Sequence, residues 1–376
     1  MKRIMHVITD LYAGGCEIML LKLLSATNGK WDQSVVSLGG VGTLGPRIAE
    51  LGIPVHALGV RGSWNPFRLS SLIPLVRRIK PHVIAGWMHH GNLAASLASV
   101  AAPGPVPVLW NIQQSLYDIS SERKATAALI RLGRALSQRP AAIIYNTRVG
   151  AQQHEAFGYC GRNRIVIPTG FDCLQFRPDT EARRQVRAEL GLTEKEVVVG
   201  LVARYHPMKD HAGFLKAASL VAQSHPEVRF LLAGIRITPS EPDFQNLLRE
   251  HKLEGRVLLL GERKDMPRIA ASLDIACSAS AWGEGFSNAV GEAMACGVPC
   301  VVTDIGDSAY LVADTGLAVP PRQPEAFAKA LSHLVAGGPS FRQQLGKAAR
   351  QRIEREFSLA SVAGSYEELY RKYPEF

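Results

Sequence analysis

The sequence predicts an α/β protein with two Rossmann-like domains, each built on a doubly wound parallel sheet. Short apolar, β-branched runs alternate with longer segments of helical periodicity along the whole chain. Most of these runs are apolar throughout, which is typical of parallel strands covered on both faces. The alternation restarts after residues 168–178, a stretch with glycine and proline that is typical of a linker. A chain of 376 residues also fits about two domains.

In the first half, the runs predicted as strands are residues 4–9, 34–38, 55–58, 82–86, 106–112, 142–146 and 164–167. Helices predicted between them include residues 17–26, 69–79 and 121–136. In the second half, the predicted strands are residues 197–203, 229–233, 257–260, 275–277, 299–303 and 317–319. The helices there include residues 210–223, 243–251 and 286–295. Because strands and helices alternate, parallel pairing is expected, with a ligand beyond the carboxyl ends of the strands, in the cleft between the domains.

The charge of the chain is uneven. There are 43 Lys and Arg against 33 Asp and Glu, a formal net charge of +10. Residues 1–172 hold 18 of the basic and 8 of the acidic residues, so the whole excess lies in the first half. This asymmetry indicates an anionic partner for that half, such as a membrane surface, a phosphorylated acceptor or nucleic acid. The alternative is a solvated basic surface without a partner.

The sequence carries no signal that directs the chain into or across a membrane. The charged N-terminus precedes an apolar run of only about six residues, which is typical of a first strand rather than of a signal peptide. No run approaches the roughly 18 apolar residues of a membrane span. Six cysteines are too few for a disulfide scaffold in a chain of this length. A cytoplasmic protein is therefore expected.

Gly14 and Gly15 follow the first predicted strand and precede an apolar helix. Glycine permits close backbone approach, and a helix N-terminus attracts anions, so a phosphate could bind the Gly15 amide. The alternative is a tight turn without a ligand. A G-x-G-x-x-G match at residues 40–45 follows the second strand instead of the first and lacks an acidic residue about 20 positions later, which argues against a dinucleotide site.

Arg204 and Lys209 follow the first strand of the second half. Arginine offers a planar fork of donors and lysine a point charge, and the two together suit a diphosphate at the carboxyl end of a strand. Such cations can also stabilise the charge that develops on a departing nucleotide diphosphate. The alternative is a pair of loop cations in solvent.

Residues 282–299 form the most informative motif. Glu284 lies in a glycine-rich loop and Glu292 on the helix that follows, where carboxylates can bind sugar and ribose hydroxyls. The amides of Gly285, Phe286 and Ser287 open this helix and can contact phosphate or sugar oxygens. The alternative for Glu292 is a buried structural carboxylate. The stretch falls one residue short of a G-x-S-x-G elbow, so a serine hydrolase is disfavoured.

Taken in order, the motifs Gly14-Gly15-x-Glu17, Arg204-x4-Lys209 and Glu284-Gly-Phe-x-Asn-x3-Glu292-Ala-Met-Ala-x-Gly-x-Pro299 resemble those of the family-four retaining glycosyltransferases, which have the GT-B fold. The resemblance also covers residues 166–172, 307–309 and 315–316, nearly the whole chain. It implies transfer of a sugar from a nucleotide sugar, expected to be UDP-linked, with retention at the anomeric carbon. It also implies that no metal and no other cofactor takes part, and the chain contains no Asp-x-Asp motif.

The resemblance also implies roles for single residues. The Gly15 amide, Arg204 and Lys209 would hold the donor diphosphate, Glu284 the donor sugar and Glu292 the ribose. Glu284, Arg204 and Lys209 are the expected catalytic residues, in a front-side displacement in which the leaving phosphate oxygen accepts the acceptor's proton. The full set of expected donor-binding residues is Gly14, Gly15, Arg204, Lys209, Arg263, Gly285, Phe286, Ser287, Asn288 and Glu292.

On the acceptor side, the sequence departs from the family pattern. The family often has a histidine near the reacting sugar, at about the position of Gln113 and Gln114. His89 and His90, which follow the fourth predicted strand, are substitute candidates. The alternative is a pair of histidines at a helix start without a chemical role.

The resemblance further implies domain boundaries and partners. Residues 1–170, with a C-terminal helix in residues 359–376 packing back on them, would bind the acceptor, and residues 171–358 the donor. The acceptor is expected to be lipid-linked or a saccharide. The basic first half would then contact a lipid diphosphate or the inner face of an anionic membrane. The residues proposed for that contact are Trp64, Phe67, Arg68, Leu69, Leu72 and Arg77.

Four other functions are weighed against the sequence. A nucleotide-sugar epimerase or a phosphorylase could share the fold, although no pyridoxal-binding lysine stands out. A non-catalytic nucleotide-sugar-binding protein is disfavoured because Arg204, Lys209, Glu284 and Glu292 are all present. Nucleic acid is disfavoured as a partner because no recognisable binding module or Lys/Arg-dense run is present.

Overall fold

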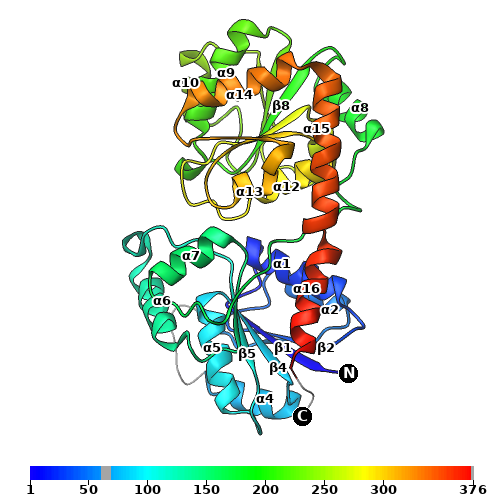
Figure 1. Ribbon diagram of the computed structural model, residues 1–376. Coiled ribbons are helices and arrows are strands. Elements are labelled where there is room, and N and C mark those ends of the chain that lie inside the picture. Colours follow the sequence, from blue (N-terminus) through cyan, green and yellow to red (C-terminus); the bar gives the residue numbers. More distant parts are fainter. Residues whose placement is uncertain (61–68, 374–376) are drawn as a thin grey trace. The chain divides into compact units, whose positions relative to one another are not determined.

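The computed structural model describes residues 1–60 and 69–373, which fall into two compact units. Unit 1 comprises Met1–Gly170 and Leu359–Phe376, and unit 2 comprises Phe171–Ser358. Each unit consists of a parallel sheet with helices on both faces (Figure 1). The predicted fold class, two doubly wound α/β domains, is therefore confirmed.

Within its described residues, unit 1 has a seven-stranded sheet of order β3-β2-β1-β4-β5-β6-β7. All neighbouring strands pair in parallel. The strand order reverses between β1 and β4, which is the topological switch point where doubly wound sheets bind ligands. The strands are β1 (Arg3–Ile8), β2 (Asp32–Ser37), β3 (Val55–Ala57), β4 (Val83–Trp87), β5 (Val108–Ile112), β6 (Ala142–Tyr145) and β7 (Arg164–Val166).

Helices cover both faces of this sheet. The helices of unit 1 are α1 (Gly15–Ala26), α2 (Gly45–Glu50), α4 (Leu72–Ile79), α5 (Met88–Val100), η1 (Ile119–Ser121), α6 (Lys124–Leu136), α7 (Arg148–Ala156) and α16 (Leu359–Arg371). One apolar core joins α1 and α16 to the sheet, and a second core joins α4, α5 and α6 to the opposite face. The apolar composition of the strands follows from this burial on both sides.

The C-terminal helix α16 is an integral part of unit 1. Its Tyr366 and Tyr370 rings are buried in the core shared with α1, and the Tyr366 hydroxyl lies 3.0 Å from Asn111 Oδ1 on β5. Lys30 forms an ion pair of 2.6 Å with Glu367, whose side chain is largely buried. The apolar face of the helix therefore packs against the core that it shares with α1 and the sheet, and Figure 1 shows the helix within unit 1.

The structure corrects the membrane contact expected around α4. Leu69 and Leu72 are buried in the core of unit 1, so their side chains are not available to a lipid surface. Arg77 is exposed. Trp64, Phe67 and Arg68 lie outside the described residues. Of the helices that the structure describes, none is both long and apolar enough to cross a membrane.

Unit 2 has a six-stranded sheet of order β10-β9-β8-β11-β12-β13, again with parallel pairs throughout. Its order reverses between β8 and β11. The strands are β8 (Val197–Val202), β9 (Val228–Ala233), β10 (Val257–Leu259), β11 (Ile275–Ser278), β12 (Cys300–Thr303) and β13 (Leu317–Val319).

The helices of unit 2 again form a layer on each face of the sheet, over two apolar cores. They are α8 (Thr180–Glu189), η2 (Pro207–Lys209), α9 (His211–Ser224), α10 (Pro242–Glu250), α11 (Met266–Ser272), α12 (Asn288–Ala295), α13 (Ser308–Val312), η3 (Ala313–Thr315), α14 (Pro324–Ala336), α15 (Gly338–Arg352) and the π-helical turn η4 (Ile353–Phe357). The predicted helix at residues 286–295 begins two residues later, at Asn288, which leaves Phe286 and Ser287 in the loop.

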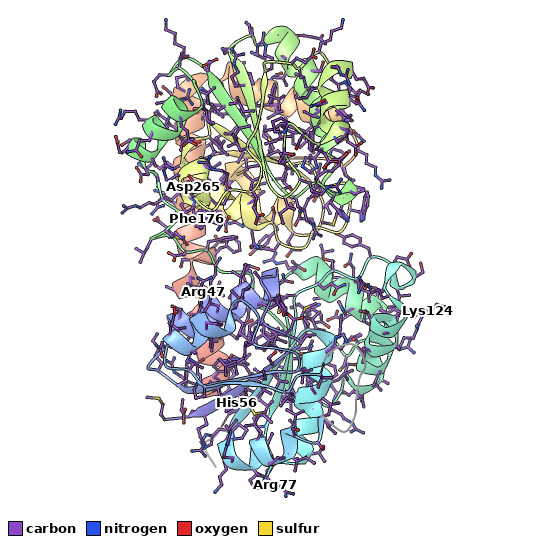
Figure 2. The ribbon with its side chains drawn as sticks, turned by 180° about the vertical axis from the view of Figure 1, so that it is seen from behind. Arg47, His56, Arg77, Lys124, Phe176 and Asp265 are labelled. Carbon is purple, nitrogen blue, oxygen red and sulfur yellow. The ribbon has the colours of Figure 1, made fainter. Side chains whose placement is uncertain are left out.

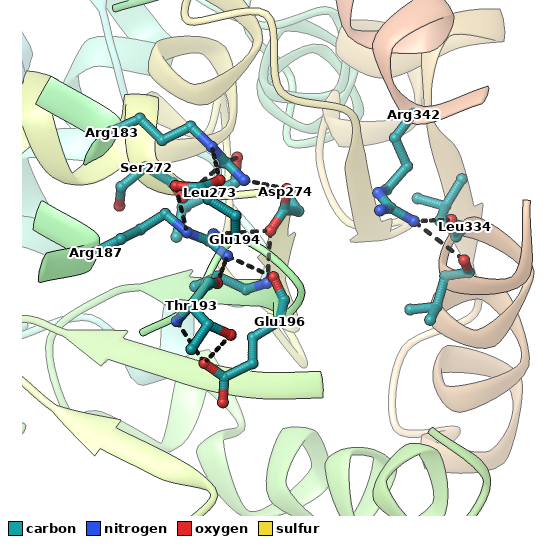
Figure 3. A network of polar contacts seen from close by, with 12 residues as sticks. Arg183, Arg187, Thr193, Glu194, Glu196, Ser272, Leu273, Asp274, Leu334 and Arg342 are labelled. Atoms are coloured by element: carbon teal, nitrogen blue, oxygen red, sulfur yellow. Dashed lines mark hydrogen bonds and ion pairs between the residues drawn. The ribbon is translucent and has the colours of Figure 1, made fainter. Parts of the chain in front are cut away.

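A buried ionic network ties α8 to the amino ends of β8 and β11 (Figure 3). The Arg187 side chain is 1% exposed, and its guanidinium lies 3.3 Å from Asp274 Oδ2. Arg183 pairs with the other carboxylate oxygen of Asp274 at 2.9 Å. The backbone amide of Val198 also donates to Asp274 Oδ2, at 2.7 Å. The carboxylate thus accepts from three donors, two on α8 and one on β8, as a buried charge requires.

Candidate functional site

A cavity of about 230 Å³ lies at the switch point of the unit 2 sheet, between the carboxyl ends of β8 and β11. This is the place where a doubly wound sheet is expected to bind its ligand. The cavity is lined by Leu201, Val202, Ala203, Lys209, Cys277, Ser278, Ala279, Ser280, Glu284, Phe286, Ser287, Asn288 and Ala289. Five of the residues predicted from the sequence are among them: Lys209, Glu284, Phe286, Ser287 and Asn288.

An ion pair between Lys209 and Glu284 forms one wall of this cavity. Lys209 Nζ contacts Glu284 Oε2, and the Ser280 hydroxyl donates to the same oxygen at 2.8 Å. Glu284 is only 9% exposed, so the attraction between the two charges is weakly screened by solvent. The two residues come from loops after different strands, β8 and β11, and meet because those strands are neighbours in the sheet.

The loop that carries Glu284 is held in place from both sides. The Thr303 hydroxyl donates to the carbonyl of Ser280 at 2.7 Å, and the Asp307 amide donates to the carbonyl of Gly285 at 3.0 Å. On the other side, the Ala281 amide donates to the carbonyl of Met208 at 2.8 Å. These bonds connect the loop to β12 and to the turn that carries Lys209, so the carboxylate is presented by a fixed backbone.

The N-terminus of α12 opens on the cavity. Ser287 is the residue before the helix, and its side chain makes no capping hydrogen bond, so the first helical amides are not capped by it. Asn288 at the first helical position is exposed. Phe286 is buried and stacks on Phe171, with 5.9 Å between the ring centroids. Glu292 lies one turn into α12, half-buried, and does not line the cavity.

The remaining two cations predicted for this unit differ in their surroundings. Arg204, directly after β8, is exposed. Arg263 is held by two carboxylates: its Nε and Nη2 contact Asp265 at 2.8 Å each, and its Nη1 contacts Glu189 at 2.8 Å. These bonds raise the pKa of Arg263 above its ordinary value. The structure therefore places the Arg263 guanidinium in an ion-pair network beside α11.

In unit 1, Gly14 and Gly15 lie where the sequence predicts, at the N-terminus of α1. Gly15 is exposed, and a methyl group added there would meet nothing within 4 Å, so the side-chain position is open to solvent. Gly14 is different, because an added methyl group would lie 2.4 Å from a carboxylate oxygen of Glu17. Burial, with a smaller contribution from Asp10, raises the pKa of Glu17.

His89 and His90 have different environments at the start of α5. His89 is 5% exposed, and its ring packs 5.8 Å from that of His154. Burial, helped by the nearby His154 and His90, lowers the pKa of His89 to about 3, so its ring is neutral at neutral pH. Burial also lowers the pKa of His90, which Asp10 partly offsets. The structure thus places His89 in the core, and His90 is the candidate that is partly open to solvent.

Gln113 and Gln114 follow the carboxyl end of β5, and both are half-buried. Gln114 Nε2 donates to Glu122 Oε1 at 2.6 Å, which fixes its amide within unit 1. Its position at a strand end agrees with a role in substrate contact. The alternative is that Gln114 has a purely structural role, through its hydrogen bond to Glu122.

A larger cavity, of about 720 Å³, lies at the amino ends of the unit 2 strands, opposite the site described above. Its wall includes Asp274 and Arg342 (Figure 3). Size alone does not identify it as the active site. Asp274 is already satisfied by Arg183 and Arg187, and ligands of doubly wound sheets bind at the carboxyl ends.

Two residues of the loop that carries Glu284 were not predicted from the sequence. Ser280 donates to Glu284, and Trp282, two residues before that glutamate, is 39% exposed. The residue type of Trp282 does not mark it in the sequence, because singly exposed apolar side chains are common on protein surfaces.

Among residues 1–60 and 69–373, no group of three or more His, Cys, Asp or Glu side chains is arranged to hold a metal ion. Lys209 is a cationic side chain that lines the cavity, and Arg204 follows β8 in the sequence.

Two family models match the chain, one in each unit. Residues 14–170 match the glycosyl transferase 4-like domain, and residues 182–352 match the glycosyl transferases group 1. The two matches together leave only the termini and the segment between the units uncovered. The second contains Arg204, Lys209, Glu284 and Glu292.

Individual proteins of known sequence are also similar. A putative glycosyltransferase of Bacillus subtilis, EpsF, is 25% identical over 81% of this chain and 79% of the relative. A UDP-Gal:alpha-D-GlcNAc-diphosphoundecaprenol alpha-1,3-galactosyltransferase of Escherichia coli is 27% identical over 54% of this chain and 53% of its own length. A D-inositol 3-phosphate glycosyltransferase of Mycobacterium sp. is 32% identical, over 53% of this chain and 45% of the relative.

Solved structures share the fold over the full chain. Anabaena Alr3699/HepE, crystallised in complex with UDP, has a TM-score of 0.86 at 19% identity and covers 99% of this chain and 100% of that one. Sucrose-phosphate synthase from Thermosynechococcus elongatus has a TM-score of 0.79 at 18% identity, with 99% of each chain covered. At these identities the similarity concerns the fold.

Proposed function

Because the chain belongs to the glycosyltransferases of the GT-B fold, we propose that it moves a sugar from a UDP-sugar to a lipid-linked or saccharide acceptor. The proposal includes retention at the anomeric carbon and no metal. The acceptor oxygen would bond to the anomeric carbon as the bond to the diphosphate breaks on the same face. The proton of the acceptor would pass to the leaving phosphate oxygen.

The observation that carries the proposal is the Lys209–Glu284 ion pair in the switch-point cavity of unit 2, beside the N-terminus of α12. A lysine ammonium carries three N–H donors, so Nζ can contact a phosphate oxygen while it stays bound to Glu284. The other carboxylate oxygen of Glu284 can then accept from a sugar hydroxyl. With Arg204 nearby in sequence, the site offers positive charge where a departing diphosphate becomes more negative.

The donor base and the acceptor class rest on the relatives. HepE was crystallised with UDP, and the Escherichia coli relative is named for UDP-Gal and a diphosphoundecaprenol acceptor. The net positive charge of unit 1 is compatible with an acceptor that carries a diphosphate. Gly15, His90 and Gln113 are the unit 1 residues proposed to contact substrate.

Incubating the protein with a panel of UDP-sugars and a lipid-diphosphate acceptor tests this function. We expect one or a few UDP-sugars to release UDP in an acceptor-dependent way, with unchanged rates in excess EDTA and a product of retained configuration by NMR. Release of an epimerised nucleotide sugar, an inverted product, or loss of activity in EDTA that added metal restores would each contradict a part of the proposal.

A basic face of unit 1 supports binding at an anionic membrane. Residues 123–154 contain no Asp or Glu, and Arg123, Lys124, Arg131 and Arg139 on and beside α6 are exposed. Leu132, on the same helix, is 49% exposed and could insert between headgroups. Figure 2 shows the Lys124 side chain extending outward from unit 1.

Co-sedimentation with vesicles measures this association. The wild type is expected to bind vesicles that contain anionic lipid, more weakly as salt rises, and to leave neutral vesicles unbound. Lys124→Glu with Arg131→Glu should weaken binding about tenfold or more, since each cation near such a surface contributes about 1 kcal/mol. Lys216→Glu, at an exposed position on α9 of unit 2, is the control. If the double variant bound anionic vesicles as well as the wild type, the membrane contact would lie elsewhere on the protein.

A further inference from the structure

Trp282 is an exposed indole in the loop that carries Glu284. It is 39% exposed, whereas Trp87 and Trp110 in unit 1 are almost fully buried. It does not line the switch-point cavity, although Ser280 before it and Glu284 after it do. Trp282 therefore belongs to the loop that forms part of the cavity wall, two residues before the carboxylate proposed to hold the donor sugar.

The position of Trp282 is fixed by its neighbours in the chain. The Ala281 amide bonds to the carbonyl of Met208, and Gly283 adopts a φ of +72°. A methyl group at Gly283 would lie 2.5 Å from the flexible end of the Met208 side chain, and the positive φ is the feature that favours glycine there. The tryptophan is thus presented by an anchored backbone, and its exposure does not come from a loosely held loop.

A cation from another element covers one face of the indole. The Arg322 guanidinium carbon lies 5.4 Å from the centre of the Trp282 ring, a cation–π contact. Arg322 follows β13 and has a φ of +58°, which an arginine rarely adopts. Arg322 thus contacts the Trp282 ring from a segment 40 positions later in the sequence. Positive φ at residues other than glycine also occurs elsewhere in this chain, for example at Lys80 at the end of α4, so the contact itself is the observation that matters.

From these contacts we propose that Trp282 is a specificity residue that stacks its uncovered face on the pyranose ring of the donor. One face of a hexopyranose is a patch of C–H groups, which is apolar and slightly positive, and the face of an indole is apolar and negative. Glu284 would accept from the hydroxyls at the edge of the same sugar. The inference rests on the proposed function and adds that the sugar, as distinct from the nucleotide, is recognised by an aromatic surface.

Binding measurements on nucleotide and nucleotide sugar separate the two parts of the donor. For Trp282→Ala, calorimetry should show an affinity for the nucleotide alone within about twofold of wild type. The affinity for the nucleotide sugar should fall about tenfold, which corresponds to ~1.4 kcal/mol. Trp282→Phe keeps a smaller ring, so its affinity for the nucleotide sugar should lie between those of the wild type and Trp282→Ala. Leu174→Ala, at a position 88% exposed in unit 2, is the control.

A fluorescence readout tests for contact directly. Adding the nucleotide sugar should change the tryptophan emission of the wild type more than adding the nucleotide, and Trp282→Phe should remove that difference. Equal losses of affinity for both ligands, no loss for either, or a raised KM for the acceptor with unchanged donor affinity would overturn the proposal. The test uses whichever nucleotide sugar the wild type binds, so failure of UDP-sugars as donors would count against the proposed function only.

Discussion

Replacing Lys209 by methionine is expected to lower kcat/KM for the sugar donor by about 10²–10³-fold, the usual loss when a charge-stabilising donor is removed from an active site. The side chain keeps its apolar stem but loses the ammonium that contacts Glu284. Glu284→Gln, which keeps the size of the side chain and removes its charge, is expected to have an effect of similar size. Steady-state kinetics with the cognate donor measure both.

The double variant sharpens this expectation. The two residues share one contact. The variant with both Lys209→Met and Glu284→Gln should therefore lower kcat/KM by less than the product of the fold-losses of the two single variants. Lys216→Met is the matched control, since Lys216 pairs with Glu325 at 2.9 Å in the same unit but both side chains are more than half exposed. It should leave the kinetics unchanged. Single variants within threefold of wild type would show that the ion pair lies outside the active site.

Replacing Asp274 by alanine is expected to destabilise unit 2 by about 3–5 kcal/mol, because the buried Arg187 guanidinium then has only the exposed Glu194, 3.7 Å away, as a charged partner. The change also leaves the Val198 amide, which donates to Asp274 at 2.7 Å, without an acceptor. Urea unfolding followed by circular dichroism, with separate transitions assigned to the two units, measures the loss. The unit 1 transition should stay in place.

The same helix supplies the control for this prediction. Arg184 on α8 pairs with Glu181 at 2.7 Å, but the two side chains are 69% and 57% exposed. Arg184→Ala should change the free energy of unfolding by less than about 1 kcal/mol, as surface pairs do. Similar losses for Asp274→Ala and Arg184→Ala would mean that burial does not set the strength of the network.

The strand pattern was predictable because buried parallel strands are apolar along their whole length. β1, β8 and β11 all begin and end within one residue of the prediction. Helix starts were less predictable. α12 begins at Asn288 and not at Phe286. The reason is that the carbonyl of Gly285, the residue before Phe286, accepts from the Asp307 amide in the loop after β12. That bond joins positions 22 residues apart, beyond the reach of a local pattern.

The sequence predicted which residues form the site, but it did not predict which of them contact one another. Lys209 and Glu284 stand out by motif, but their meeting depends on β8 lying next to β11. His89 shows the opposite outcome. Histidines after a strand suggest a substrate contact, yet Met88 adopts a φ of +60° where α5 begins, and the His89 ring lies against His154 in the core. Burial of this kind follows from tertiary packing alone.

The return of the chain to unit 1 through α16 has a consequence for how the protein is made. Residues 171–358 are synthesised before residues 359–371, so all of unit 2 leaves the ribosome while unit 1 still lacks its final helix. Until then the surface that Tyr366 and Tyr370 cover is open, and Asn111 has no tyrosine hydroxyl to bond. The domain that begins first is therefore the one that finishes last, and its fold can be completed only after unit 2 has been synthesised.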